Sequence, residues 1–297
     1  MLHPVLQRQL RKLELSVDSA PNDKAWARFL ERVDRSYRDN DQDRYIVERS
    51  LEVSSEEMRE MTGQLQSAIE QVRNLSLTDE LTGLRNRRFL NVSMPDDVAL
   101  TIRKYRGQEN EQRVSNDSDM LFMMVDLDLF KNVNDTYGHL AGDMVLNQMG
   151  KLLIDCSRRA DFVIRWGGEE FLVVGRQSSR TELRFLAERI RKTVEAHRFD
   201  IGKDKPIHLT CSVGAAVFPF TVKWPELFSW DRVVGLADLC LYAAKHSGRN
   251  AWVEILSTDR ISLNELVSSL DTHLPELIHK DKLEMFSNLP SDKVLFQ

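Results

Sequence analysis

Residues 162–174 read FVIRWGGEEFLVV. The stretch starts with an apolar run, breaks at Gly167-Gly168, continues with Glu169 and Glu170, and returns to an apolar run. Two strand-like runs around a pair of glycines predict a tight β-hairpin, because glycine tolerates the positive φ angles that short turns require. Two carboxylates therefore follow directly after the turn of a predicted hairpin.

Alternating strand and helix signals surround this hairpin from residue 77 to about residue 256. Strand-like runs cover 121–125, 208–218 and 251–255, and apolar residues recur at helical spacing over 140–153, 183–194 and 233–245. The polar segment 107–119 breaks the periodicity, so we expect a surface loop there. The pattern favours a domain that mixes strands and helices.

Two more carboxylates, Asp126 and Asp128, follow the apolar run 121–125. An ionised carboxylate at the edge of an apolar core is unfavourable unless it is paired or binds a cation. If this strand neighbours the hairpin, Asp126 and Glu169 converge on one site of oxygen ligands, which favours Mg²⁺ or Mn²⁺ over Zn²⁺. Each carboxylate taken alone is better explained as a strand-end residue that faces water.

Basic side chains suited to phosphate lie in the same domain. Lys131 follows Phe130, and Lys245 and Arg249 are four residues apart at the end of the predicted helix 233–245. Such cations can clamp phosphates, although Lys and Arg at a helix end are also a common complement to the helix dipole. Together with the carboxylates they form the metal-plus-phosphate set that nucleotidyl transfer requires.

The composition of the 297 residues narrows the class of protein. Hydrophobic residues make up 42% and charged residues 29%, which argues against disorder, and the net charge of −5 gives no support for a nucleic-acid partner. No stretch approaches the ~20 apolar residues of a membrane span, and the first residues lack a signal-peptide core. Three scattered cysteines are expected to be reduced core residues, so we predict a cytoplasmic protein.

Residues 1–76 have a helix-favouring composition, with a helix-start signal at 21–23. A seam with alternating spacings of four and three residues runs through Val47, Leu51, Ser54, Met58, Met61, Leu65, Ala68, Val72 and Leu75. It predicts a dimeric coiled coil; the alternative is an amphipathic helix packed on its own domain. We therefore divide the chain into a helical region of unknown role (1–45), a coiled coil (46–76), the mixed domain (77–256) and a tail with one amphipathic helix (257–297).

Five motifs give this domain a family resemblance. Residues 125–143 read VDLDLFKNVNDTYGHLAGD and residues 165–171 read RWGGEEF, and together they resemble the GGDEF family of diguanylate cyclases. Further matches are LTDELTGLRNRR at 77–88, CSVGAA at 211–216 and ADLCLYAAKHSGRN at 237–250. The resemblance covers about 77–256 and implies an α/β fold with a central, mostly antiparallel sheet flanked by helices.

The resemblance also implies a reaction, the condensation of two GTP into cyclic di-GMP with release of two pyrophosphates. It assigns two Mg²⁺ or Mn²⁺ ions per active site to Asp126, the Leu127 carbonyl and Glu169. Catalytic roles fall to Glu169, Glu170 and Lys131. Substrate binding is implied for Phe130, Lys131, Asn134, His139, Asp143, Lys245 and Arg249, with Asn134 and Asp143 at the guanine edge.

A second site is implied by position. Arg158 and Asp161 precede Gly167 at the spacing of the family's inhibitory RxxD site, where the cyclic di-GMP product binds back, and Arg189 lies where a supporting arginine is expected. Arg158 offers a planar donor fork and Asp161 an acceptor for guanine N–H groups. The alternative is an exposed cluster of charges at a helix end.

Each domain of this kind holds one GTP, so the reaction implies a homodimer, which the coiled coil would hold together. The helices of residues 1–45 are candidates for binding an upstream sensor protein. Three alternatives stay open: a catalytically idle receptor for cyclic di-GMP, a helical scaffold, and a cyclase with another nucleotide preference. The intact 167–171 signature and Asp126 argue against the first.

Overall fold

The computed structural model describes residues 4–13, 15, 23–75, 77–107, 118–270 and 273–296. The chain forms two compact units, Met1–Ser76 and Leu77–Gln297. Most of the predicted surface loop 107–119, and the helix-start signal at Pro21 and Asn22, lie outside the described residues. No helix of the described ranges is long and apolar enough to cross a membrane.

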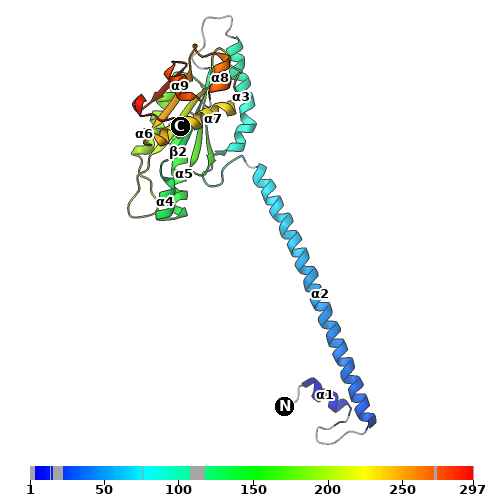
Figure 1. Cartoon of the computed structure of the whole chain (residues 1–297). Coiled ribbons are helices and arrows are strands. Elements are labelled where there is room, and N and C mark those ends of the chain that lie inside the picture. Colours follow the sequence, from blue (N-terminus) through cyan, green and yellow to red (C-terminus); the bar gives the residue numbers. More distant parts are fainter. Residues whose placement is uncertain are drawn as a thin grey trace. The chain divides into compact units, whose positions relative to one another are not determined.

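The first unit is helical, as predicted. Helix α1 covers Pro4–Lys12, and α2 is a single helix of 53 residues over Asp23–Leu75 (Figure 1). The predicted boundary between 45 and 46 therefore falls inside a continuous helix. The seam residues Leu51, Met58 and Leu65 are each more than 60% exposed. An exposed apolar row on a long helix is typical of a surface that a partner helix covers.

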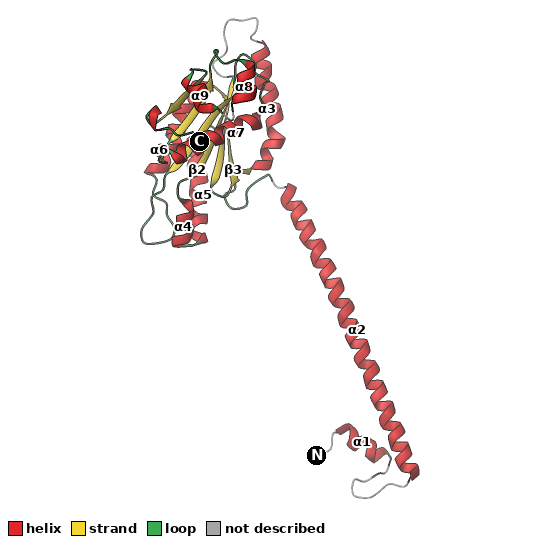
Figure 2. Cartoon of the chain, in the orientation of Figure 1, coloured by secondary structure: helices red, strands yellow, loops and turns green. Residues whose placement is uncertain are grey.

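The second unit is built on one seven-stranded mixed sheet with the order β1-β3-β4-β2-β5-β6-β7. Only β1–β3 and β5–β6 are parallel, so the predicted, mostly antiparallel sheet is confirmed. Figure 2 shows the yellow strands of this sheet with the red helices around them. The strands are β1 (Arg85–Asn86), β2 (Asp119–Leu127), β3 (Phe162–Gly167), β4 (Glu170–Ser178), β5 (Cys211–Phe218), β6 (Trp252–Ser257) and β7 (Leu283–Ser287).

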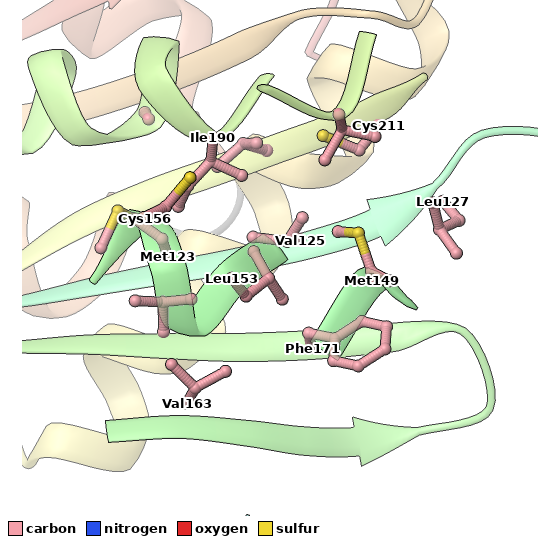
Figure 3. Close-up of a cluster of buried hydrophobic side chains, with 14 of the residues drawn as sticks. Met123, Val125, Leu127, Met149, Leu153, Cys156, Val163, Phe171, Ile190 and Cys211 are labelled. Atoms are coloured by element: carbon pink, nitrogen blue, oxygen red, sulfur yellow. The ribbon is translucent and has the colours of Figure 1, made fainter. Parts of the chain in front are cut away.

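Helices cover both faces of the sheet because its central strand is apolar on both. In β2 all nine residues are buried: Met123 and Val125 pack with α5 and α6, whereas Phe122 and Met124 pack with α3, α7, α8 and α9. Figure 3 shows the first of these clusters. The helices are α3 (Arg87–Gly107), α4 (Phe130–Tyr137), α5 (His139–Cys156), α6 (Leu183–Ala196), α7 (Trp230–His246), α8 (Leu263–Ser269) and α9 (Leu274–His279), with the 3-10 turns η1 (Arg180–Glu182) and η2 (Ser291–Lys293).

Every strand and helix predicted for 121–255 is present, with ends shifted by a few residues. Cys156, Cys211 and Cys240 are free and buried, as expected. Three helices were not predicted: α3, α4 and, in the segment after residue 257, α9. Helix α3 carries Pro95 in its interior, which breaks the usual helix signal, and α4 is only eight residues long.

Residues 257–297 contain more regular structure than the single amphipathic helix predicted for them. Instead of one amphipathic helix outside the domain, they supply α8, α9 and β7, and β7 pairs antiparallel with β6. Five leucines of this segment are buried in the core with α7: Leu266, Leu270, Leu274, Leu277 and Leu283. The domain that contains the hairpin therefore extends well past residue 256.

A glycine brings α7 close to the sheet. A Cβ at Gly214 of β5 would clash with the backbone oxygen of Ala237 and the backbone nitrogen of Leu241. Because the collision is with backbone rather than with a flexible side chain, only glycine allows this approach. The close contact fixes the position of α7, which ends near the strand-end carboxylates.

Candidate functional site

The sheet register brings the predicted carboxylates to one edge. Strand β2 pairs with β4 so that Asp126 lies opposite Glu170, and β3 and β4 are joined at Gly167 and Glu170 through a turn in which Gly168 has φ +52°. Glu169 stands in that turn. The tight hairpin and the convergence of Asp126 with the hairpin glutamates are thus both present.

Asp126 is the most buried member of this group, with 5% of its surface exposed. Its Oδ2 atom lies 2.8 Å from Nζ of Lys245. Burial raises the pKa of Asp126 to about 6, the neighbouring charges of Glu169 and Glu170 raise it as well, and Lys245 opposes them. Burial also raises the pKa of Glu170. The site therefore holds more negative charge than Lys245 balances, which attracts a further cation.

Asp128 has a different role from Asp126. Its carboxylate accepts hydrogen bonds from Thr210 Oγ1 at 2.6 Å and Ser212 Oγ at 2.7 Å, and from the backbone N–H of Asn250 at 2.9 Å. With these donors Asp128 fixes the loop that follows α7. In this loop Gly248, Arg249 and Asn250 all have positive φ, which is unfavourable for Arg249 and Asn250, and the hydrogen bond from the Asn250 backbone to Asp128 helps to hold this conformation.

The predicted phosphate-binding residues lie around the same edge. Phe130 is buried at the start of α4, where the helix follows β2, and Lys131 next to it is exposed. Arg249 is exposed in the loop held by Asp128, whereas Lys245 is engaged with Asp126. The exposed Lys131 and Arg249 side chains are accessible to an anionic ligand.

The predicted base-reading residues meet where α4 packs on α5. A Cβ at Gly142 would clash with Oδ1 of Asn134, so the Asn134 amide lies against the backbone just before Asp143. Asp143 is half-buried in the first turns of α5, and His139 begins that helix in an exposed position. Asn134 and Asp143 are therefore neighbours, while His139 stands at the surface beside them.

The donor set fits a hard cation. The predicted set consists of two carboxylates, Asp126 and Glu169, and the carbonyl of Leu127, and all three are oxygen donors. In the described part of the chain, no group of three or more Asp, Glu, His or Cys side chains is placed so that it could hold a metal ion by itself. Mg²⁺ is commonly bound by one or two carboxylates with substrate phosphates and water supplying the rest, so this small set suits it.

Arg165 supports the hairpin, a role that sequence reasoning missed. Its guanidinium donates to both oxygens of Asp79 at 3.1 Å and to the carbonyl of Gly168 at 2.9 Å and 3.1 Å. Burial raises the pKa of Asp79, but hydrogen bonds from Thr82 and Arg165 outweigh it, so the pKa lies below its usual value. Asp79 and Arg165 belong to two of the quoted motifs, and their pairing fixes the Gly-Gly turn.

The three residues of the predicted second site line one cavity of about 160 Å³. Arg158 donates its backbone N–H to Asp161 Oδ2 at 2.7 Å, and Arg189 donates to the carbonyl of Cys156 at 2.6 Å. Asp161 also accepts from the backbone N–H of Arg176. The same cavity is lined by residues that no sequence motif indicated, among them Glu182 and Phe185.

Comparison with known proteins gives these two sites a context. The model of the family described as "Diguanylate cyclase, GGDEF domain" matches residues 76–251, more than half of the chain. Diguanylate cyclase A of Treponema denticola is 36% identical over 180 residues, which cover 61% of this chain and 44% of that protein. Diguanylate cyclase DgcP of Pseudomonas aeruginosa is 34% identical over 244 residues, covering 81% of this chain and 33% of that protein.

The chain thus spans between a third and a half of the length of these two relatives. Among solved structures, the coiled coil and GGDEF domain of DgcB from Caulobacter crescentus, in complex with c-di-GMP, is 27% identical with a TM-score of 0.47. That alignment covers 68% of this chain and 97% of the other.

Proposed function

Because this chain belongs to the GGDEF domain family, we propose that it is a diguanylate cyclase, which condenses two GTP into cyclic di-GMP and releases two pyrophosphates. One observation carries the proposal: Asp126 and the hairpin glutamates meet at one edge of the sheet, beside Lys245. The group combines oxygen donors for a divalent cation with an ammonium for phosphate, as nucleotidyl transfer requires.

In the proposed complex, GTP lies across the edge formed by β2, α4 and the loop after α7. Lys131, Lys245 and Arg249 bind the triphosphate oxygens, with Phe130 packing at the start of α4. The Asp143 carboxylate accepts from N1–H and the 2-amino group of guanine together, and Asn134 and His139 complete the substrate pocket. An adenine offers no such pair of donors, so this pocket selects GTP.

Asp126, the Leu127 carbonyl and Glu169 would hold the divalent cation, two Mg²⁺ or Mn²⁺ per site in our proposal. When bound, such ions lower the pKa of an attacking 3′-hydroxyl and neutralise charge on the phosphates. Lys245 keeps Asp126 oriented, and Glu170 supports the centre by accepting a hydrogen bond from the ribose. Arg165 holds the turn that presents Glu169 and therefore acts as a positioning residue.

Each domain binds one GTP, so turnover needs two domains face to face, and we propose a homodimer held by the seam of α2. The exposure of Leu51, Met58 and Leu65 supports this assembly. Leu65→Lys would place a charge inside the dimer interface, so we expect monomers in analytical ultracentrifugation and turnover that rises steeply with protein concentration. A monomeric wild-type chain with full turnover would rule the assembly out.

We also propose that cyclic di-GMP inhibits the enzyme from the cavity of Arg158, Asp161 and Arg189. Two guanidinium groups and a carboxylate in one small cavity match the phosphates and the guanine N–H groups of that product. This cavity includes none of the residues assigned to GTP, so product and substrate bind at separate places.

The test is mass-spectrometric product analysis of the purified chain with GTP and Mg²⁺, after a phosphodiesterase has removed any bound dinucleotide. We expect cyclic di-GMP from the wild type, none from Glu169→Ala, and a sustained late rate from Arg158→Ala. ATP offered together with GTP should give no mixed product. Absence of product from all variants, with dinucleotide binding that depends on Arg158, would make the chain a receptor instead.

A further inference from the structure

The cavity of Arg158 has a built-in competitor for its ligand. Nη2 of Arg158 donates to Oε1 of Glu182 at 2.8 Å, and Glu182 lies at the end of η1, directly before α6. Glu182 lines the same cavity. The Glu182 carboxylate therefore already accepts a hydrogen bond from the Arg158 guanidinium, which an incoming phosphate or guanine would need.

This ion pair is easily displaced. The side chains of Arg158 and Glu182 are 57% and 40% exposed, so water screens the attraction between them. Asp161, the other carboxylate of the cavity, is held by backbone N–H groups of Arg158 and Arg176. Glu182 is thus the acidic group that must give way when an anion enters, and its charge also repels phosphates.

Phe185 adds an attractive surface to the same cavity. It lies on α6 one turn before Arg189, so the two side chains share a helix face, and 71% of Phe185 is exposed. A large aromatic ring left this exposed beside two guanidinium groups offers a stacking platform for a purine base.

We propose that Glu182 and Phe185 set the affinity of this cavity for a cyclic purine dinucleotide in opposite directions: Glu182 weakens binding by competing for Arg158, and Phe185 strengthens it by stacking. The proposal rests on the product-binding site proposed above. In functional terms, the Glu182–Arg158 pair sets the product concentration at which inhibition begins.

The experiment is isothermal titration calorimetry of cyclic di-GMP into the full chain, stripped of dinucleotide. Glu182→Gln should bind about three- to tenfold more tightly, because it loses the competing charge. Phe185→Ala should bind about tenfold more weakly, and Phe185→Tyr should restore near wild-type affinity. The matched control for Glu182→Gln is Glu276→Gln, because Glu276 on α9 is also an exposed partner of a basic residue, Lys280. The matched control for Phe185→Ala is Val267→Ala, because Val267 on α8 is an exposed apolar residue.

Unchanged or weaker binding by Glu182→Gln would overturn the competitor role, and unchanged binding by Phe185→Ala would overturn the stacking role. Arg158→Ala should abolish the signal; retained binding would locate the dinucleotide elsewhere and overturn both. Product formation from GTP by the wild type is measured separately. A chain that binds as expected but makes no product leaves this inference standing and contradicts the cyclase proposal alone.

Discussion

The ammonium of Lys245 lies 2.8 Å from the carboxylate of Asp126, which joins the end of α7 to the end of β2. Even with this partner, burial keeps the pKa of Asp126 raised at about 6. The ionised carboxylate is therefore less favourable in the folded chain than in water. A residue that weakens the fold in this way is typical of a binding site rather than of a structural ion pair.

The first prediction separates function from stability at this position. Asp126→Asn removes the unfavourable buried charge, so the thermal midpoint at pH 8 should equal or exceed that of the wild type. Cyclic di-GMP formation should fall at least about 100-fold, because a carboxylate at the proposed metal site is lost. Differential scanning fluorimetry and product chromatography measure the two effects.

Asp128→Asn is the control for this prediction. Asp128 accepts from Thr210, Ser212 and the backbone of Asn250, and an amide cannot accept from all of them. We expect a loss of about 2–3 kcal/mol in the free energy of unfolding, measured with urea. Equal stability of the Asp126→Asn and Asp128→Asn proteins would contradict the different roles of the two aspartates.

The second prediction concerns pH. Glu254 on β6 is fully buried, its oxygens accept no hydrogen bond from the described residues, and Nε of Arg184 is 3.7 Å away. Burial raises the pKa of Glu254 from 4.5 to about 7; Arg184 and Arg180 oppose this shift, and Glu284 adds to it.

Between about pH 4.5 and 7 the folded chain keeps a proton on Glu254 that the unfolded chain has released, so the contribution of Glu254 to stability falls as the pH rises through this range. Glu254→Gln should remove this contribution and flatten the decline, while the part due to Asp126, whose pKa is also raised, remains. At pH 8 the variant should be more stable by up to about 3 kcal/mol, and at pH 4 the two should be similar. Thermal melts across this range test it; parallel profiles for both proteins would refute the assignment.

The third prediction tests the close approach of α7 to the sheet. Gly214→Ala forces a Cβ into the backbone of α7, and we expect a loss of about 3 kcal/mol in the free energy of unfolding. Gly235→Ala is the matched control, because a Cβ at Gly235 within α7 meets no atom within 4 Å. It should stabilise the helix by about 1 kcal/mol. Chemical denaturation of both variants measures these changes. A Gly214→Ala protein with wild-type stability would contradict the close contact between α7 and β5.

The fourth prediction tests whether residues 257–297 belong to the core. Leu277 on α9 is buried, so Leu277→Ala should cost about 2–5 kcal/mol in the free energy of unfolding. Val267 on α8 is 66% exposed, and Val267→Ala should have little effect. Urea unfolding distinguishes the two. If both substitutions were silent, the segment would not be packed on the domain.

The sequence was most informative where a signal is local. The apolar run before Asp126 and the Gly-Gly pair predicted β2 and the β3–β4 hairpin, because burial and turn chemistry act over a few residues. The mostly antiparallel character of the sheet came from the family resemblance, and the order of its strands was not predicted, since pairing between strands far apart in the sequence leaves no periodic signal. Pro95 concealed α3 for the opposite reason: tertiary packing of that helix overrides a strong local breaker.

For the site, residue types and spacing were enough to nominate Asp126, Glu169 and Lys245, which the structure brings together. Residue types and spacing could not show that Asp128 and Asp126 have different roles, because the three hydrogen-bond donors to Asp128 lie 82 to 122 residues away in the sequence. Sequence reasoning did not identify Glu182 and Phe185 as cavity residues for the same reason. Their place beside Arg158 depends on how α6 packs against α5 and the sheet.

The pairing of β7 with β6 has a consequence for biosynthesis. Until residues 283–287 have left the ribosome, β6 is an open edge whose buried residues Val253 and Ile255 lack their outer cover. Open apolar edges are where nascent chains pair with one another. A nascent chain that has exposed residues up to 257 but not residues 283–287 would therefore present a sheet that already contains Asp126 and the hairpin glutamates but is still prone to aggregation.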